Sequence, residues 1–162
     1  MRQVASRTGL SLSNVQYHYK SRERLLVGIT EHHLALCHDA MEAAVGDPAN
    51  VTIRGVIEAS LLDARVAEVT PPFRELFALA LGEPRVHELL MAHYRAAHTQ
   101  LTQLLSLHAP HRSPSEVAEA ASVLMAAIEG AYLIREATGV SAEAMVHRLE
   151  ATTYAMLGLD GR

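Results

Sequence analysis

The sequence predicts an all-α protein, and three observations support this class. Apolar residues recur at steps of three and four, and no stretch alternates apolar and polar residues with a period of two. Aromatic residues make up only 4% of the 162 residues, and tryptophan is absent, so residues that favour strands are scarce. Serine, proline and glycine divide the apolar segments at positions typical of helix ends.

The helices follow from these start and stop signals. With their capping residues, the expected helices are 2–7, 11–19, 21–46, 51–69, 70–82, 84–107, 113–137 and 141–158. Serine side chains that can cap a helix start four of them: Ser11, Ser21, Ser113 and Ser141. Glycine follows the last helical residue in five cases: Gly9, Gly46, Gly82, Gly139 and Gly158. The strongest start is Ser113-Pro114-Ser115-Glu116, a capping box with proline at the first helical position.

Proline sets two of the remaining boundaries. Thr70-Pro71-Pro72 is interpreted as the end of the fourth helix and the start of the fifth, because threonine caps helices and proline is favoured at their first position. Pro84 starts the next helix by the same argument. A linker is expected to begin at Asp47-Pro48.

Charge is distributed unevenly along the chain. The net charge is −4, yet residues 1–24 hold five basic residues against one acidic residue, a net charge of +4. Residues 25–162 carry the compensating −8. The chain is therefore divided into a basic head, residues 1–24, and an acidic helical body, residues 25–162. Such an asymmetry suits contact with a polyanion at the head, although a chance cluster of charges gives the same count.

The sequence also favours some cellular settings and activities over others. A single cysteine, Cys37, excludes an internal disulfide framework and fits a reducing compartment. No signal peptide and no membrane-spanning apolar run is identified, so the protein is expected in the cytoplasm. Zinc-protease, phosphate-loop and paired-nucleophile motifs are absent from the sequence. We therefore expect no enzyme activity, no cofactor and no resident metal.

The helix from Glu116 to Ala137 is apolar on more than one side. Glu119 and Glu129 are its only charged residues between Val117 and Ile134. A helix of this kind must be buried on most of its surface. We expect helices 116–137 and 142–157 to form a homodimer interface, with each subunit giving half of a four-helix arrangement. The alternative is that 116–137 is the central helix of a monomeric bundle.

The head has the pattern of a helix-turn-helix. Val4, Ala5 and Leu10 are expected to hold two short helices together, with the turn at Gly9. The second helix presents small polar side chains that suit base edges in a major groove, where Asn14 or Gln16 can bond adenine. Three further residues suit phosphates: Tyr17, Lys20 and Arg22.

These residues resemble the recognition helix of TetR-type transcriptional regulators and its exit into the following long helix. The matching residues are Gly9-Leu10-Ser11, Val15, Tyr17-His18-Tyr19-Lys20, Arg22 and Leu25-Leu26. The resemblance implies an all-helical body that binds a small-molecule effector and dimerises through its last two long helices. It also implies a DNA contact set made of Arg2, Ser11, Leu12, Ser13, Asn14, Gln16, Tyr17, His18, Lys20 and Arg22.

The chain departs from the TetR-type pattern in two respects. Gln16 occupies a position that is commonly aromatic, while Tyr19 replaces the usual phenylalanine and Arg22 the usual lysine. In addition, Met1 falls at the start of the family's second helix, so the first helix of the DNA-binding region is expected to be missing. A misplaced start codon, a truncation and a loss of DNA binding all remain open as explanations.

An effector site needs a mostly apolar lining with a few converging polar groups. The candidates on the body helices are Glu58, Arg65, His93, Glu129 and Tyr132, with Arg95, His98 and Glu136 as weaker ones. Glu129 and Tyr132 are favoured because they interrupt the most apolar helix. His33 and Cys37 have the i, i+4 spacing of a soft-metal clamp, but a core histidine beside a small apolar cysteine fits the same positions.

Two functions from different classes compete on this basis. The first is a homodimeric TetR-like regulator, a repressor that a small-molecule effector releases from its DNA operator. The second is a helical ligand-binding or metal-binding module that no longer binds DNA. The basic head favours the first function, whereas a stoichiometric metal in the purified protein would favour the second.

Overall fold

The structure is a computed structural model that describes residues 1–47 and 50–159, and these residues form eight helices and no strand. The helices are α1 Arg2–Thr8, α2 Leu12–His18, α3 Arg22–Val45, α4 Ile53–Leu62, α5 Ala64–Ala80, α6 Pro84–His108, α7 Pro114–Thr138 and α8 Ala142–Leu157. The predicted all-α class is confirmed. The prediction of a linker at Asp47-Pro48 falls partly outside the described residues.

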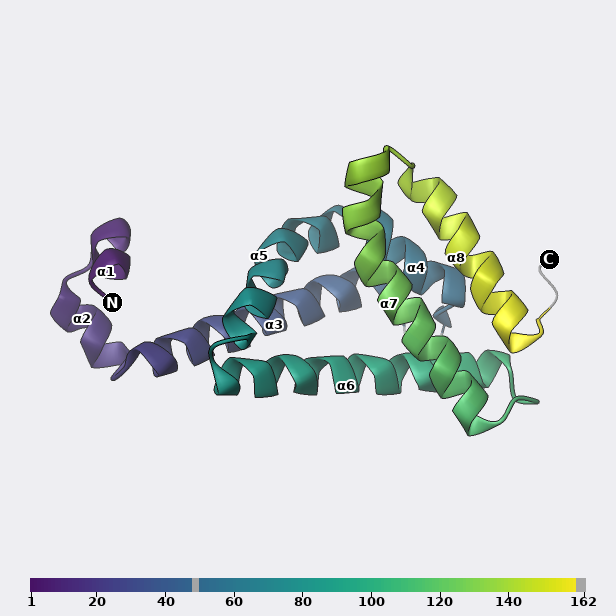
Figure 1. The fold of residues 1–162 in the computed structure, drawn as a ribbon, viewed down its shortest axis with the longest axis horizontal. Coiled ribbons are helices and arrows are strands. Elements are labelled where there is room, and N and C mark those ends of the chain that lie inside the picture. Colours follow the sequence, from purple (N-terminus) through teal and green to yellow (C-terminus); the bar gives the residue numbers. More distant parts are fainter. Residues whose placement is uncertain (48–49, 160–162) are drawn as a thin grey trace.

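Two parts of the molecule are distinct in Figure 1. The short helices α1 and α2 pack on each other at one end of the long helix α3, while α4, α5 and α6 pack against α3. Helix α7 packs on α4 and α6, and α8 packs on α4 and α7. Ala5 and Val15 form the small buried contact between α1 and α2. Leu10, which was expected to share that contact, is instead 48% exposed. The ring of Tyr19 lies against Gly28, where an added Cβ would lie 3.0 Å from Cε1 of Tyr19.

The helical body has two apolar clusters. The larger cluster joins α4, α6, α7 and α8, and its fully buried members include Ile57, Leu105, Val117, Val146 and Leu157. The smaller cluster joins α5 and α6 through Phe73, Leu76 and Leu90, with Leu34 and Cys37 of α3 packed against it. Helix α6 belongs to both clusters and therefore connects the half of the body near the head to the half that contains α7 and α8.

The predicted serine caps are confirmed. Oγ of Ser11, Ser21, Ser113 and Ser141 each accepts a hydrogen bond from a backbone N–H three residues later. At the start of α7 the capping box is complete, because the Glu116 carboxylate also accepts from the Ser113 backbone N–H at 2.9 Å. These bonds are local, which is why the sequence alone located these four helix starts.

The capping box makes the stability of the protein sensitive to acid. Hydrogen bonds from the Ser113 backbone and hydroxyl, and from Arg112, lower the pKa of Glu116 from 4.5 to about 2. A lowered pKa stabilises the folded state above pH 4.5, and this contribution is lost as the pH falls from 4.5 towards 2. We expect Glu116→Gln to lower the thermal midpoint at pH 7 and to have little effect at pH 2.5. Glu119→Gln, at an exposed position on the same helix, is the control and should show no such pH dependence.

The predicted boundary at Thr70-Pro71-Pro72 is wrong. The fourth helix ends at Leu62, and α5 begins after Asp63, whose carboxylate accepts from the Arg65 backbone N–H at 2.8 Å. Pro71 and Pro72 lie inside α5. Proline leaves the carbonyl four residues earlier without its helical donor. Here those carbonyls belong to residues 67 and 68, which are exposed to water, so the helix continues through both prolines.

Helix α7 corrects the expectation that no segment is long and apolar enough to span a membrane. Its 25 residues pass that test by length and composition, with a mean hydropathy of 1.6 over 18 residues. Only 28% of this window is buried inside the chain, and the core helix of a soluble protein passes the same test. One face of α7 packs in the larger cluster through Val117, Ala121 and Leu124, so the surplus of apolar residues lies on its opposite face.

Candidate nucleic-acid interface and effector site

Helix α2 presents the polar side chains that the sequence assigned to DNA. Only Leu12 is partly buried among the ten predicted residues, and the other nine are exposed. Val15 is buried beneath the helix, so the polar residues must face outward. The Ser11 hydroxyl caps α2, accepting from the Asn14 backbone N–H at 3.0 Å. In this structure the Ser11 hydroxyl therefore serves to start α2.

The cations at the end of α2 have different surroundings. Nζ of Lys20 lies 5.3 Å from the centre of the Tyr17 ring, and that ring contacts His18 edge to face. Arg22 is not free in this structure, because its guanidinium donates a hydrogen bond to the Glu83 carboxylate just before α6. The predicted phosphate contact of Arg22 thus competes with an ion pair to the body.

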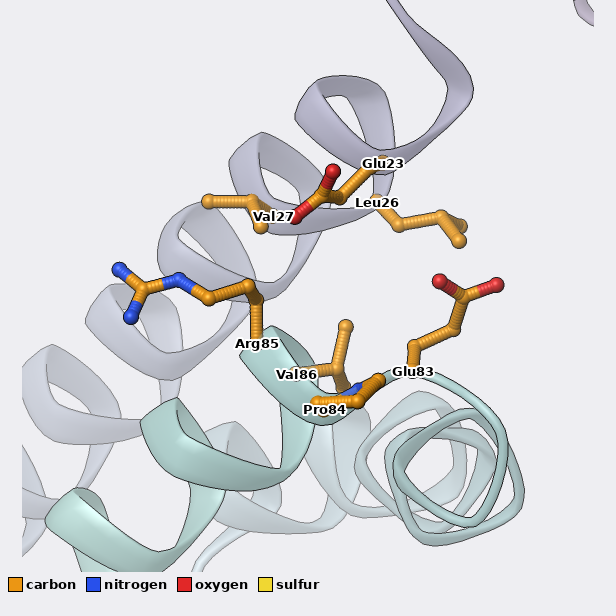
Figure 2. A pocket seen from close by; sticks show the side chains of 7 residues that line it. All are labelled: Glu23, Leu26, Val27, Glu83, Pro84, Arg85 and Val86. Atoms are coloured by element: carbon orange, nitrogen blue, oxygen red, sulfur yellow. The ribbon is translucent and has the colours of Figure 1, made fainter.

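A small cavity of about 300 Å³ lies where this ion pair joins the two parts. It is lined by Glu23, Leu26 and Val27 of α3 and by 83–86, at the start of α6 (Figure 2). Glu83 therefore lies at the junction between the head and the body.

The structure brings together three of the five predicted effector residues. Glu129 and Tyr132 of α7 interact electrostatically, and His93 of α6 is linked to them through Tyr94, whose ring contacts His93 and whose hydroxyl lies beside Glu129. The His93 ring lies 5.6 Å from that of Phe73, and the Arg74 guanidinium lies 5.8 Å from the centre of the Tyr132 ring. The Tyr132 hydroxyl donates to the Ser60 carbonyl at the end of α4.

Desolvation shifts the pKa values of this region. It lowers the pKa of His93, with a further contribution from the charge of His38, and it raises that of Glu129. Glu129 remains partly exposed to water. Its pKa is raised because protein atoms of the same chain surround part of its carboxylate. The buried hydroxyl of Tyr94 lies beside the Glu129 carboxylate without forming a hydrogen bond of regular geometry. Burial, followed by the charge of Glu129, raises its pKa.

The other two predicted effector residues lie elsewhere. Glu58 pairs with Arg54 at 2.8 Å on α4, and Arg54 also pairs with Glu150 of α8 at 2.7 Å. Arg65 pairs with Asp63 at 2.6 Å at the start of α5, where more than half of its side chain is exposed. Both belong to surface ion pairs and stand apart from the other three.

An open cavity of about 420 Å³ lies beside Tyr132, between α5 and the last turns of α7. Two arginines that the sequence analysis did not single out, Arg74 and Arg135, line it together with Tyr132 and Glu136. Arg135 donates to the Leu61 carbonyl at 3.4 Å, a long hydrogen bond. No sequence motif indicates these arginines, because they come from helices about sixty residues apart.

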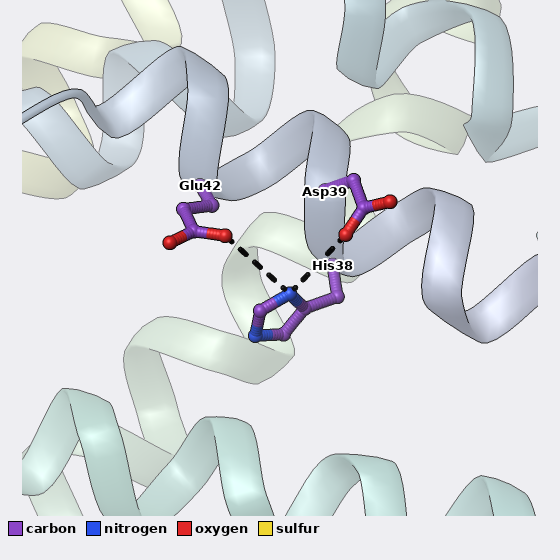
Figure 3. Close-up of side chains that lie close together, drawn as sticks. All are labelled: His38, Asp39 and Glu42. Carbon is purple, nitrogen blue, oxygen red and sulfur yellow. Dashed lines mark ion pairs between the residues drawn. The ribbon is translucent and has the colours of Figure 1, made fainter.

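The possible metal ligands on α3 divide into two groups. His33 Nε2 lies 3.0 Å from the Val69 carbonyl oxygen, and burial raises the pKa of the Cys37 thiol to about 11, so this pair fits a core role. On the exposed side, His38 Nδ1 lies 3.7 Å from Asp39 Oδ1 and 3.9 Å from Glu42 Oε2 (Figure 3). These three side chains can approach one ion, but exposed acidic groups are common without one.

The face of α7 turned away from the core is apolar and exposed. It consists of one helical stripe, Val123, Ala126, Gly130, Leu133 and Ile134. A Cβ at Gly130 would meet nothing within 4 Å. On α8, Met145, Leu149 and Met156 are half-buried against the larger cluster of the same chain. Of these two helices, α7 therefore carries the exposed apolar stripe, whereas the apolar side chains of α8 are directed into its own chain.

A basic head that presents an exposed polar helix, joined to an all-helical body, is typical of helix-turn-helix transcriptional regulators. The comparisons with known proteins agree with this class. The chain is 30% identical over 135 residues to an uncharacterised HTH-type transcriptional regulator from the dhlA 5′ region of Xanthobacter autotrophicus. The match covers 80% of the chain but only 66% of that relative. No protein-family model matches.

Solved structures with the same fold extend the comparison. A transcriptional regulator from Rhodococcus sp. Rha1 superposes with a TM-score of 0.75 at 20% identity, over 97% of this chain and 84% of that one. A proposed transcriptional regulator from Pseudomonas aeruginosa PAO1 gives 0.76 at 17% identity, over 97% and 79%. The chain therefore shares the all-α fold of these solved proteins and is related to an HTH-type regulator, and both findings agree with the resemblance to TetR-type regulators.

Proposed function

We propose that this chain is the TetR-like subunit of a homodimeric, cytoplasmic transcriptional repressor that a small-molecule effector releases from DNA. The observation that carries the proposal is the geometry of α2. Its buried residue, Val15, faces α1, and its polar residues face solvent beside a cluster of cations. This arrangement suits a recognition helix, in which side chains near the N-terminus contact bases and the flanking cations contact phosphates.

The helical body would supply the other two parts of this function, dimerisation and the response to an effector. The apolar stripe on α7 suits an isologous dimer, because the same face on two copies can pack together without any further element. Two heads then have to reach successive major grooves, about 34 Å apart. An effector in the body would change the populations of states with different head separations. The Arg22–Glu83 ion pair is the contact through which α6 would act on the head.

DNA binding tests the proposal through two substitutions in the head. We expect Lys20→Ala to weaken binding to every sequence and to reduce the slope of log affinity against log salt by about one. We expect Gln16→Ala to change the preference among operators that differ at one base pair, by about 1–3 kcal/mol. Fluorescence anisotropy on the chain's own upstream DNA, at two salt concentrations, measures both effects. The chain extended by its in-frame upstream codons is compared in parallel.

Arg7→Ala is the matched control, since this exposed cation lies on α1 outside the predicted contact set. Equal losses on all sequences from Lys20→Ala and Gln16→Ala would contradict the assigned roles. Absence of binding by both the chain and its extended form would contradict DNA binding altogether.

The alternative function, a metal-binding module without DNA binding, has one observation in its favour. Only the exposed trio His38, Asp39 and Glu42 gathers three possible ligand atoms within 4.8 Å of one another in the described residues. Elemental analysis of the purified protein distinguishes the two functions. One equivalent of a transition metal that is lost in His38→Ala would favour the alternative.

A further inference from the structure

The cavity between α5 and α7 has two arginines that lack strong partners. Nε of Arg135 is buried and has no hydrogen-bond partner in the described ranges 1–47 and 50–159, and its NH1 makes only the 3.4 Å bond to the Leu61 carbonyl. A buried cationic donor without an acceptor costs folding free energy. The Arg135 guanidinium is therefore suited to donate hydrogen bonds to an anionic ligand. Arg74 lies across the same cavity and approaches Glu136 only at 4.0 Å.

The residues that line the cavity carry a net positive charge, while the Glu129 carboxylate, which also acts on Arg74, is not part of the lining. Of the described residues that line it, Arg74 and Arg135 are cationic and Glu136 alone is acidic. The Glu136 side chain is 78% exposed, so it can move away from Arg74 into water at little cost. The other walls are largely apolar: Leu61, Ala67, Pro71 and Val140. A ligand that fits has a carboxylate at one end and a small apolar body at the other.

We propose that this cavity binds a small organic carboxylate, held between the guanidinium groups of Arg74 and Arg135. Its apolar part lies against Pro71 and Val140. Guanidinium groups bind carboxylates through paired, charge-assisted hydrogen bonds, which gives both affinity and orientation. The volume, about 420 Å³, lies within the range of small-molecule sites. The proposal names the effector class of the proposed regulator, and in that respect it rests on the proposed function.

The position of the cavity explains how such a ligand would act. Tyr132 and Arg135 of α7 hold the carbonyls of Ser60 and Leu61, next to the break between α4 and α5. A carboxylate bound to Arg135 competes with the Leu61 carbonyl for the same guanidinium. The residues beside Arg135 on α7, Leu133 and Ile134, belong to the exposed stripe assigned to the dimer. Binding would therefore act on both the α4–α5 junction and the dimer helix.

The test measures binding directly on the full chain without DNA. Hexanoate and benzoate are titrated by calorimetry, with hexanamide and benzamide as neutral probes of the same shape and inorganic phosphate as an anion without an apolar body. We expect saturable binding of a carboxylate, no binding of its amide, and weaker binding of phosphate. Arg74→Gln and Arg135→Gln should each reduce the affinity at least about tenfold.

Arg95→Gln is the control, because Arg95 is exposed on α6 and does not line the cavity. Arg74 is itself exposed, so its substitution tests the site even if Arg135→Gln destabilises the fold. The proposal is overturned if no carboxylate binds up to its solubility limit, if the amides bind equally well, or if both arginine variants keep their affinity.

The same titrations repeated with operator DNA separate this site from the proposed function. Carboxylate binding that leaves the affinity for DNA unchanged supports the site and contradicts its effector role. Carboxylate binding by a chain that does not bind DNA supports the site and contradicts the regulator.

Discussion

Replacing Gly130 with leucine is expected to convert the proposed dimer into a monomer. The Cβ at this position meets nothing within 4 Å in the single chain, so the fold accepts the larger side chain. Leucine also favours a helix over glycine by roughly 0.8–1 kcal/mol. In a dimer packed through the α7 stripe, however, the same side chain would fall between two closely packed helices. Light scattering should then give a mass near 17.6 kDa in place of twice that value.

If Gly130→Leu breaks the dimer, the affinity for operator DNA should also fall. A monomer engages one half-site, and loss of the second contact removes an avidity of about 10²–10⁴. Gly82→Leu is the matched control, because its Cβ also meets open space but lies in the turn between α5 and α6. An unchanged mass for Gly130→Leu would show that α7 is not the interface.

The second large effect is expected in the core of the body. Leu105→Ala should destabilise the protein by about 2–5 kcal/mol, the cost of the lost apolar contacts and of the cavity left behind. Leu105 is fully buried in the larger cluster, between α4, α7 and α8. Urea unfolding at a fixed protein concentration measures the loss as a lower midpoint with an unchanged slope.

Leu107→Ala provides an internal comparison on the same helix. Leu107 is 79% exposed, two residues beyond Leu105, and the same substitution there should change stability by no more than about 0.5 kcal/mol. Similar losses at both positions would mean that Leu107 is covered in solution, which would place a subunit contact on α6 and contradict an interface confined to α7.

The local signals in the sequence located most of the secondary structure. Ser11, Ser21, Ser113 and Ser141 start helices where predicted, since each cap bonds a backbone N–H only three residues away. The exposed face of α2 was also predictable, because one buried residue on a short helix fixes which residues point outward. The prolines misled the prediction: proline is common at a helix start, but water can also satisfy the carbonyls it leaves free inside a helix.

The sequence by itself determined the all-α class, the helix-turn-helix head and the apolar character of α7, because these depend on local caps and periodicity. Only the tertiary structure decided which polar residues converge. It placed Glu58 and Arg65 in surface ion pairs and brought Arg74 and Arg135 to one cavity. The Tyr132–Ser60 and Arg135–Leu61 hydrogen bonds join residues 72 and 74 positions apart. No local sequence pattern predicts such contacts, since they depend on how α4, α5 and α7 pack against one another.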